Sequence, residues 1–299
     1  MAERKRLLKR SFLVYVGNQN NSTVSVINSA SNRVIKTIPV GKNPGQVNAS
    51  PDGRQIYAIN GGDRSISILS TRTNQVTRTI RNVSPEPFAA VSVGNRFYVP
   101  DLYTGGVTVF NALTNGSIAR FPVANLPLAI AASPDGKKLY VTTQARNIWI
   151  IDTRLNRVVN SIPTGATWGL DFTPDGKKFV VNSFGTNETL IYCVRTNKII
   201  NSIPVGVAPI DINVSRDGRR AYVANSRSRS VSVIDLKAKR VIKTIQVGDV
   251  PYNLAITPDD RSVYVTNNGS NTVSVIDART LKVLLTIPVG LGPRGIAII

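Results

Sequence analysis

The sequence contains no histidine, one cysteine and one methionine, and each scarcity excludes a class of chemistry. Without histidine, the chain alone cannot form Ser-His-Asp or Cys-His catalytic sites, nor the histidine-based zinc sites common in enzymes. Cys193 has no second cysteine with which to form a disulfide, and we interpret it as a small buried hydrophobic residue. We therefore predict no metal site and no cofactor.

Long apolar runs and acidic residues are also scarce. No stretch approaches the roughly 18 consecutive apolar residues that a spanning helix needs, so we expect no transmembrane segment. Residues 1–10 are basic and no signal-peptide core follows them. This predicts a cytoplasmic protein as written, or a cell-surface or periplasmic one if a signal has been removed. Against 37 Lys and Arg there are 17 Asp and Glu, which gives a net charge of +20.

The strongest pattern is an internal repeat with a period of about 40 to 42 residues. Seven segments of the Tyr-Val-x-Asn type begin at positions 15, 57, 98, 140, 180, 222 and 264. Within one period, four short runs rich in Val, Ile and Tyr alternate apolar with polar residues, at 210–215, 219–225, 230–235 and 240–247. Turns of the Ser/Thr-Pro-Asp-Gly kind separate many of the runs. The pattern predicts an all-β fold, a seven-bladed β-propeller of four-stranded antiparallel blades.

The two ends of the chain predict how the ring closes. Residues 293–299 match the first strand of a repeat, and residues 12–40 supply the other three strands. We expect the C-terminal strand to join the three N-terminal strands in one blade, because this pairing covers two otherwise exposed edges. The prediction is a single domain over 11–299 with a basic tail over 1–10, and we expect a monomer of prokaryotic type.

The repeat resembles the YVTN family of seven-bladed propellers, which are similar to surface-layer proteins. The resemblance rests on the Tyr-Val-Thr-Asn segment at 264–267, the Thr-Val-Ser-Val-Ile-Asp strand at 272–277 and the Ile-Pro-Val-Gly segment at 287–290. It covers about 290 residues and implies the propeller fold. The family includes binding scaffolds, surface proteins and a few enzymes, so the resemblance implies no single activity.

A propeller assigns each loop to one of two faces. The top face holds the loops that join second to third strands and fourth strands to the next blade, and the bottom face holds the others. Basic residues far outnumber acidic ones on the predicted bottom face and nearly balance them on the top. Such a surface attracts nucleic acid, an anionic wall polymer or an acidic protein. The alternative is that the charge only keeps the protein soluble. The candidate contacts are Lys137, Lys138, Lys177, Lys178, Arg219, Arg220, Lys237, Lys239 and Arg240.

The top mouth of the central channel is the second candidate site, because the first strands of all blades converge there. Its side chains differ from blade to blade, which the scaffold does not require. The candidates for binding a small ligand are Gln46, Phe88, Trp168, Asp211, Tyr252, Asn253 and Arg294. For Phe88 and Trp168 we slightly favour packing between blades over ligand contact.

Asp171 and Asp211 are weak catalytic candidates. They are the acidic residues placed in predicted inner strands, so two carboxylates can face the channel. They could share a proton or hold a cation, but we favour simple hydration. Three function classes stay open: a non-catalytic binding scaffold, a small-molecule enzyme with its site at the top mouth, and a structural surface or coat component. We lean toward the scaffold, and so toward a protein that is not an enzyme.

Overall fold

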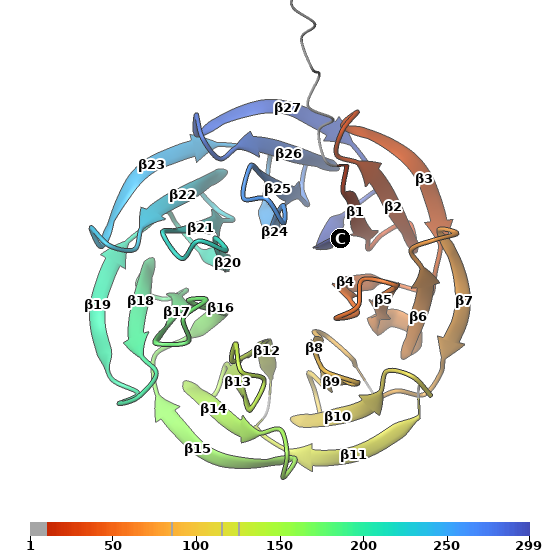
Figure 1. The fold of residues 1–299 in the computed structure, drawn as a ribbon, viewed down its shortest axis with the longest axis horizontal. Helices are drawn as coiled ribbons and strands as arrows, with labels where there is room; N and C mark the ends of the chain where they lie inside the picture. Colours follow the sequence, from red (N-terminus) through yellow and green to blue (C-terminus); the bar gives the residue numbers. More distant parts are fainter. Residues whose placement is uncertain (1–10, 85, 115, 125) are drawn as a thin grey trace, which may run out of the picture.

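A computed structural model describes residues 11–84, 86–114, 116–124 and 126–299, so the predicted basic tail over 1–10 lies outside the described residues. The described chain forms 28 strands and one short 3-10 helix, η1 (Gly61–Asp63). The strands build seven four-stranded antiparallel sheets, arranged as blades around a central axis (Figure 1). The prediction of a seven-bladed β-propeller is confirmed. None of the described residues forms a helix long and apolar enough to cross a membrane.

The blades are numbered from the N-terminus, and each is given from its innermost to its outermost strand. Blade 1 contains β28 (Pro293–Ile298), β1 (Leu13–Asn18), β2 (Thr23–Asn28) and β3 (Arg33–Pro39). Blade 2 contains β4 (Pro44–Ala49), β5 (Gln55–Asn60), β6 (Ser65–Ser70) and β7 (Gln75–Ile80). Blade 3 contains β8 (Val91–Val93), β9 (Arg96–Pro100), β10 (Gly106–Asn111) and β11 (Ser117–Pro122).

The other four blades lie between residues 127 and 288. Blade 4 contains β12 (Pro127–Ala132), β13 (Lys138–Thr143), β14 (Asn147–Asp152) and β15 (Arg157–Pro163). Blade 5 contains β16 (Thr167–Phe172), β17 (Lys178–Ser183), β18 (Glu188–Cys193) and β19 (Ile199–Pro204). Blade 6 contains β20 (Pro209–Val214), β21 (Arg220–Asn225), β22 (Ser230–Asp235) and β23 (Arg240–Gln246). Blade 7 contains β24 (Pro251–Ile256), β25 (Ser262–Asn267), β26 (Thr272–Asp277) and β27 (Lys282–Pro288).

Ring closure follows the prediction. Strand β28 pairs antiparallel with β1, with Val14 opposite Ile298 and Tyr15 opposite Ala297. The strand boundaries predicted for blade 6 agree with the structure within one residue. Blade 3 differs from the other blades in its first strand. Strand β8 has three residues, and an isolated bridge joins Pro87 to Asp101.

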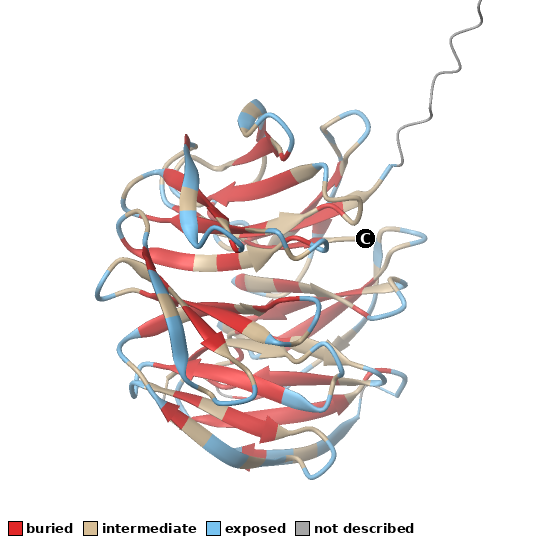
Figure 2. Cartoon of the chain, turned by 60° about the vertical axis from the view of Figure 1, so that its left-hand side comes forward, coloured by how far each residue is buried: buried red, intermediate tan, exposed pale blue. Residues whose placement is uncertain are grey.

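The hydrophobic core lies between neighbouring blades, as the buried bands in Figure 2 indicate. One cluster, for example, joins Tyr15 and Val26 of blade 1 to Ile56 and Leu69 of blade 2. Burial of one such side chain contributes about 1.5–3 kcal/mol. The Tyr15 hydroxyl also donates a 2.6 Å hydrogen bond to Asn74 Oδ1 in the next blade. Tyr15 therefore holds blades 1 and 2 together through both its ring and its hydroxyl.

Two glycines set how closely the inner strands approach. A Cβ on Gly295 of β28 would lie 2.5 Å from Gln46 Cα of β4, and a Cβ on Gly169 of β16 would lie 2.6 Å from the carbonyl oxygen of Ile210 in β20. Since both obstructing atoms belong to the backbone, no side-chain movement can relieve either contact. These close approaches fix the width of the central channel between the blades concerned.

Candidate functional site

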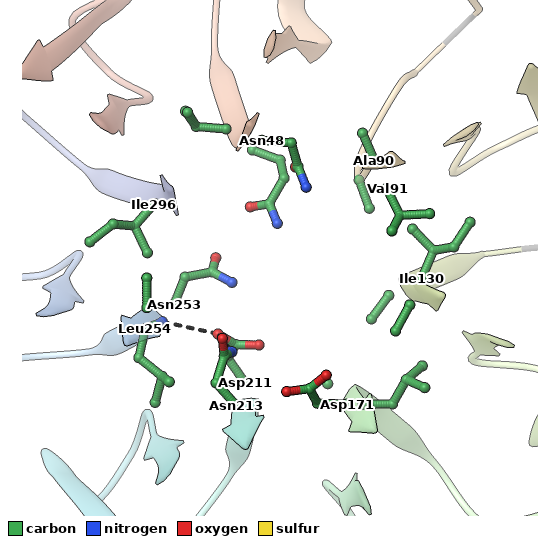
Figure 3. A pocket seen from close by; sticks show the side chains of 18 of the residues that line it. Asn48, Ala90, Val91, Ile130, Asp171, Asp211, Asn213, Asn253, Leu254 and Ile296 are labelled. Carbon is green, nitrogen blue, oxygen red and sulfur yellow. Dashed lines mark hydrogen bonds between the residues drawn. The ribbon is translucent and has the colours of Figure 1, made fainter. Parts of the chain in front are cut away.

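The inner strands enclose a central cavity of about 400 Å³ that opens at the top mouth (Figure 3). All seven side chains predicted for the mouth line this cavity and are partly exposed. The sequence therefore located the side chains that converge here, whereas their role in binding stays a prediction. Among the described residues no group of three or more His, Cys, Asp or Glu side chains could hold a metal ion.

Arg294 of β28 is clamped at the mouth between two aromatic rings. Its guanidinium carbon lies 4.3 Å from the ring centroid of Tyr252 and 4.9 Å from that of Phe88, and it donates a hydrogen bond to the Tyr252 hydroxyl. A Cβ on Gly45 of β4 would have no neighbour closer than 3.9 Å, so the space beside the Arg294 guanidinium stays open. A second cavity of about 170 Å³ therefore opens beside the first, lined by Gly45, Phe88, Arg294 and Glu86. We expected Phe88 to pack between blades, and in the structure its ring contacts the guanidinium of Arg294 from blade 1.

Trp168 occupies another part of the mouth. Its ring lies 5.7 Å from the ring of Phe184 at an angle of 42°, and Phe184 belongs to the same blade. The guanidinium of Arg227 lies 5.9 Å above Phe184. The contact of Trp168 with the neighbouring blade is a hydrogen bond to its backbone carbonyl, donated by the Thr142 hydroxyl at 2.7 Å. The Trp168 ring thus contacts an aromatic ring of its own blade, and its packing between blades, which we favoured from the sequence, stays a prediction.

Phe184 contacts Trp168 but was not predicted from the sequence as a site residue. It follows the Tyr-Val-x-Asn segment directly, where other repeats have residues such as Gln19, Gln144, Ser226 or Asn268. That departure from the repeat was the available signal, and it would have placed a second aromatic ring in blade 5 near Trp168.

Asp171 of β16 and Asp211 of β20 both line the cavity, as predicted, and they point into the channel in Figure 3. Each also joins its blade to the next one. Asp171 Oδ2 accepts a 2.8 Å hydrogen bond from the amide of Val214, and Asp211 Oδ2 accepts a 2.9 Å bond from the amide of Leu254. From the sequence we expected only water to hydrate these carboxylates. In the structure, a backbone N–H of the next blade also donates a hydrogen bond to each of them.

Burial raises the pKa of both carboxyl groups above that of an exposed aspartate. The pKa of Asp171 is about 7, because desolvation outweighs the hydrogen bonds from Val214 and Phe172, and the nearby Asp211 raises it further. The pKa of Asp211 is about 6, again with desolvation as the largest cause. These two groups therefore change protonation state near neutral pH, whereas an exposed aspartate is fully ionised there.

Cys193 is partly exposed at the end of β18, so its interpretation as a buried hydrophobic residue is wrong. It stands where other blades have Asn28, Asp152 or Asp235, residues that begin the turn between the third and fourth strands. Hydrogen bonds from Thr196 lower the pKa of the Cys193 thiol. The thiol takes the place of the amide or carboxylate that accepts turn N–H groups in those blades.

The nine basic candidates gather on the bottom loops of three consecutive blades. They form pairs at the turns between first and second strands of blades 4, 5 and 6, and a further group at the turn between the third and fourth strands of blade 6. Seven of them are exposed and two are partly exposed, the latter being Lys178 and Arg220. We call this surface, defined by Lys137, Lys138, Lys177, Lys178, Arg219, Arg220, Lys237, Lys239 and Arg240, the basic arc.

The acidic residues of the same turns do little to neutralise the basic arc. In blade 4, Asp135 Oδ1 accepts hydrogen bonds from the Ser133 hydroxyl at 2.6 Å and from the amide of Lys137 at 3.1 Å. The Lys137 ammonium lies 3.9 Å from the other carboxylate oxygen, and its side chain is 81% exposed. Exposed pairs at such distances contribute almost nothing, so the aspartate serves the turn while the lysine faces solvent.

Comparison with known proteins places the fold among propellers of varied roles. A family model described as the cytochrome D1 heme domain matches residues 195–291, about a third of the chain. A seven-bladed beta-propeller protein of Mycobacterium tuberculosis is 29% identical over 45% of this chain and 36% of its own length. The beta subunit of hydrazine synthase from Kuenenia stuttgartiensis is 38% identical over 60% of this chain and 50% of its own length.

The chain thus matches half or less of the length of these curated relatives. Among solved structures, a periplasmic gluconolactonase of Pseudomonas aeruginosa superposes with a TM-score of 0.80 at 17% identity, covering 97% of this chain and 99% of that one. This likeness shows the fold alone. Membership of the YVTN family stays a prediction.

The residues around the channel do not fit the haem that the matched domain description implies. Haem iron is held by histidine, cysteine, methionine or tyrosine side chains. The chain has no histidine, and Cys193 ends β18 on the bottom side. Tyr252 is at the mouth, but its hydroxyl is bonded to Arg294. We therefore derive no chemistry through a haem.

Proposed function

We propose that this chain is a non-catalytic binding scaffold that presents the basic arc to an anionic macromolecule, such as nucleic acid, an anionic wall polymer or an acidic protein. The observation that carries the proposal is the set of paired cationic side chains on three adjacent blades, which are mostly exposed to solvent and whose acidic neighbours form only loose, exposed pairs. In blade 6, for example, Arg219 lies 3.8 Å from Asp217 and its side chain is 85% exposed. A long anionic chain can contact such side chains simultaneously, and its release of counterions favours binding.

The surface also indicates how it would recognise nucleic acid. Base stacking needs exposed aromatic rings, and among the described residues the large exposed aromatic side chain is Tyr103, in a top-face loop between β9 and β10. The basic arc offers charge without a stacking platform. Binding would therefore be directed at phosphates and independent of sequence.

The experiment that tests the proposal is a salt titration of binding to fluorescent duplex DNA, with an anionic wall polymer and an acidic protein as parallel ligands. The wild-type affinity should fall steeply with salt. The double variant K177Q/K178Q should lower the slope of log affinity against log salt by about 1.8, since each lost phosphate contact removes about 0.9.

A matched control removes the same charge from the top face. Lys42 and Arg81 are exposed there, so K42Q/R81Q has the same net charge as the test variant. The control should keep the wild-type slope. Equal loss in both variants would show that net charge alone drives binding, and no binding of any polyanion at low salt would overturn the proposal.

Catalysis in the channel is the second candidate. It is favoured by the two carboxyl groups whose pKa values are raised by burial to about 7 and 6, a range suited to general acid–base catalysis. The similar structure named a gluconolactonase suggests hydrolysis of a sugar lactone as the first assay. Hydrolysis above the blank rate that is lost in both Asp171→Asn and Asp211→Asn would support this candidate, and a rate equal to the blank would remove it.

A further inference from the structure

The channel wall breaks the sevenfold regularity of the scaffold. Equivalent positions on the inner strands carry polar side chains on blades 5, 6, 7 and 2, whereas blades 1, 3 and 4 present mainly alanine, valine and isoleucine. Figure 3 shows Ala90, Val91 and Ile130 together on one side of the channel, with Asn253 on the other side. The polar side chains are Asp171, Asp211, Asn213, Asn253, Gln46 and Asn48. Every blade has the same four-stranded fold, so formation of a blade does not require polar side chains at these positions.

The two carboxylates of the wall have no cationic partner. In the described part of the chain, neither Asp171 nor Asp211 forms an ion pair. The hydrogen bonds that they accept come from uncharged amides. Buried charges in proteins are normally paired or bound to a ligand. At pH 8 both groups are mostly ionised, so this part of the channel carries close to two negative charges in a molecule whose net charge is +20.

A separate unsatisfied group lies on the other side of the cavity. The side-chain oxygen of Asn48 in β4 is buried and accepts no hydrogen bond. Asn48 faces the aspartates across the channel in Figure 3. A buried acceptor without a donor destabilises the protein, and a ligand with N–H groups would supply the missing donor.

The opposite charge is fixed at the mouth. Arg294 is held in place by Tyr252 and Phe88, and one of its N–H groups is used on the Tyr252 hydroxyl. The remaining donors of the guanidinium border the central cavity and the smaller one beside it. A planar guanidinium held in this way is suited to a carboxylate.

We propose that the channel binds a small zwitterion, with its ammonium group at Asp171 and Asp211 and its carboxylate at Arg294. The apolar wall of blades 3 and 4 would contact the carbon chain between the two charged groups. A cavity of about 400 Å³ corresponds to roughly 13 water molecules at about 30 Å³ each, which sets the size class to amino acids and similar compounds. This site is independent of the basic arc on the bottom face.

Three six-carbon probes test the proposal by calorimetry at pH 8: 6-aminohexanoate, hexylamine and hexanoate. They share the carbon chain and differ only in their charged ends. The zwitterion should bind at least 10-fold more tightly than either singly charged probe. Asp211→Asn should remove the advantage over hexanoate, and Arg294→Gln should remove the advantage over hexylamine.

The two variants test opposite ends of the ligand, so one of them still gives a result if the other does not fold. Asp211→Asn retains an oxygen that can accept the amide hydrogen of Leu254, and Arg294→Gln reports on the other end of the ligand. K42Q/R81Q should bind all three probes as the wild type does. Absence of binding of every probe at 10 mM, or equal affinity for 6-aminohexanoate and hexanoate, would overturn the proposal. DNA binding by the basic arc should stay unchanged in Asp211→Asn, which separates this test from that of the proposed function.

Discussion

Replacement of Gly295 by alanine should destabilise the ring at the point where it closes. The added Cβ would lie 2.5 Å from Gln46 Cα and even closer to the amide nitrogen of Val47. Both atoms belong to the backbone of β4, so β28 and β4 must move apart. Overpacking of this kind typically costs about 1–3 kcal/mol, and the backbone contacts place Gly295→Ala near 3 kcal/mol. For a domain of this size the melting temperature should fall by roughly 5 °C.

The matched control is Gly45→Ala, in β4 itself. Its added Cβ would have no neighbour closer than 3.9 Å, so the backbone need not move. Thermal unfolding of the two variants and the wild type, followed by calorimetry, compares them directly. We expect Gly45→Ala within about 1 °C of the wild type. The reasoning is refuted if Gly295→Ala melts together with Gly45→Ala.

Three further predictions concern the inter-blade contacts and the channel. Tyr15→Phe removes the 2.6 Å hydrogen bond to Asn74 and should cost about 1 kcal/mol in urea unfolding, whereas Tyr140→Phe should cost almost nothing because the Tyr140 hydroxyl has no partner. The folded-state pKa of Asp171, about 7, exceeds its unfolded value, so its charged form opposes folding. The wild type should therefore lose up to about 1.4 kcal/mol per pH unit relative to Asp171→Asn between pH 4 and 7, and a pH-independent difference would contradict this. Trp168→Ala should lower stability by about 1–2 kcal/mol through lost aromatic contact and leave affinity for DNA unchanged, and a change in that affinity would contradict the separation of the two faces.

The sequence predicted the blades well because each blade is defined by local patterns. Alternating strands and Pro-Asp-Gly turns specify neighbouring pairings, and the match between 293–299 and 251–257 was sufficient to predict the closing blade. Blade 3 lacks such a turn before its second strand, and there the first strand β8 shortens to three residues.

The sequence predicted which side chains line the candidate site, but it predicted only some of the contacts between them. The repeat phase identified the side chains around the mouth, because equivalent positions in a propeller converge on one axis. The hydrogen bond from Val214 to Asp171 joins residues 43 positions apart, so it depends on how two blades pack and leaves no local pattern. The contact between the rings of Trp168 and Phe184 likewise depends on a loop conformation that the repeat does not specify.

The most direct test of the proposed scaffold is a map of the lysines that an anionic ligand protects. The purified protein would be acetylated at low salt with and without duplex DNA, and each lysine would be quantified by mass spectrometry. Lys137, Lys177 and Lys237 of the basic arc should become several-fold less reactive with DNA, while Lys42 on the top face should not change. Protection spread equally over both faces, or confined to Lys42, would contradict the assignment of the bottom face as the binding surface.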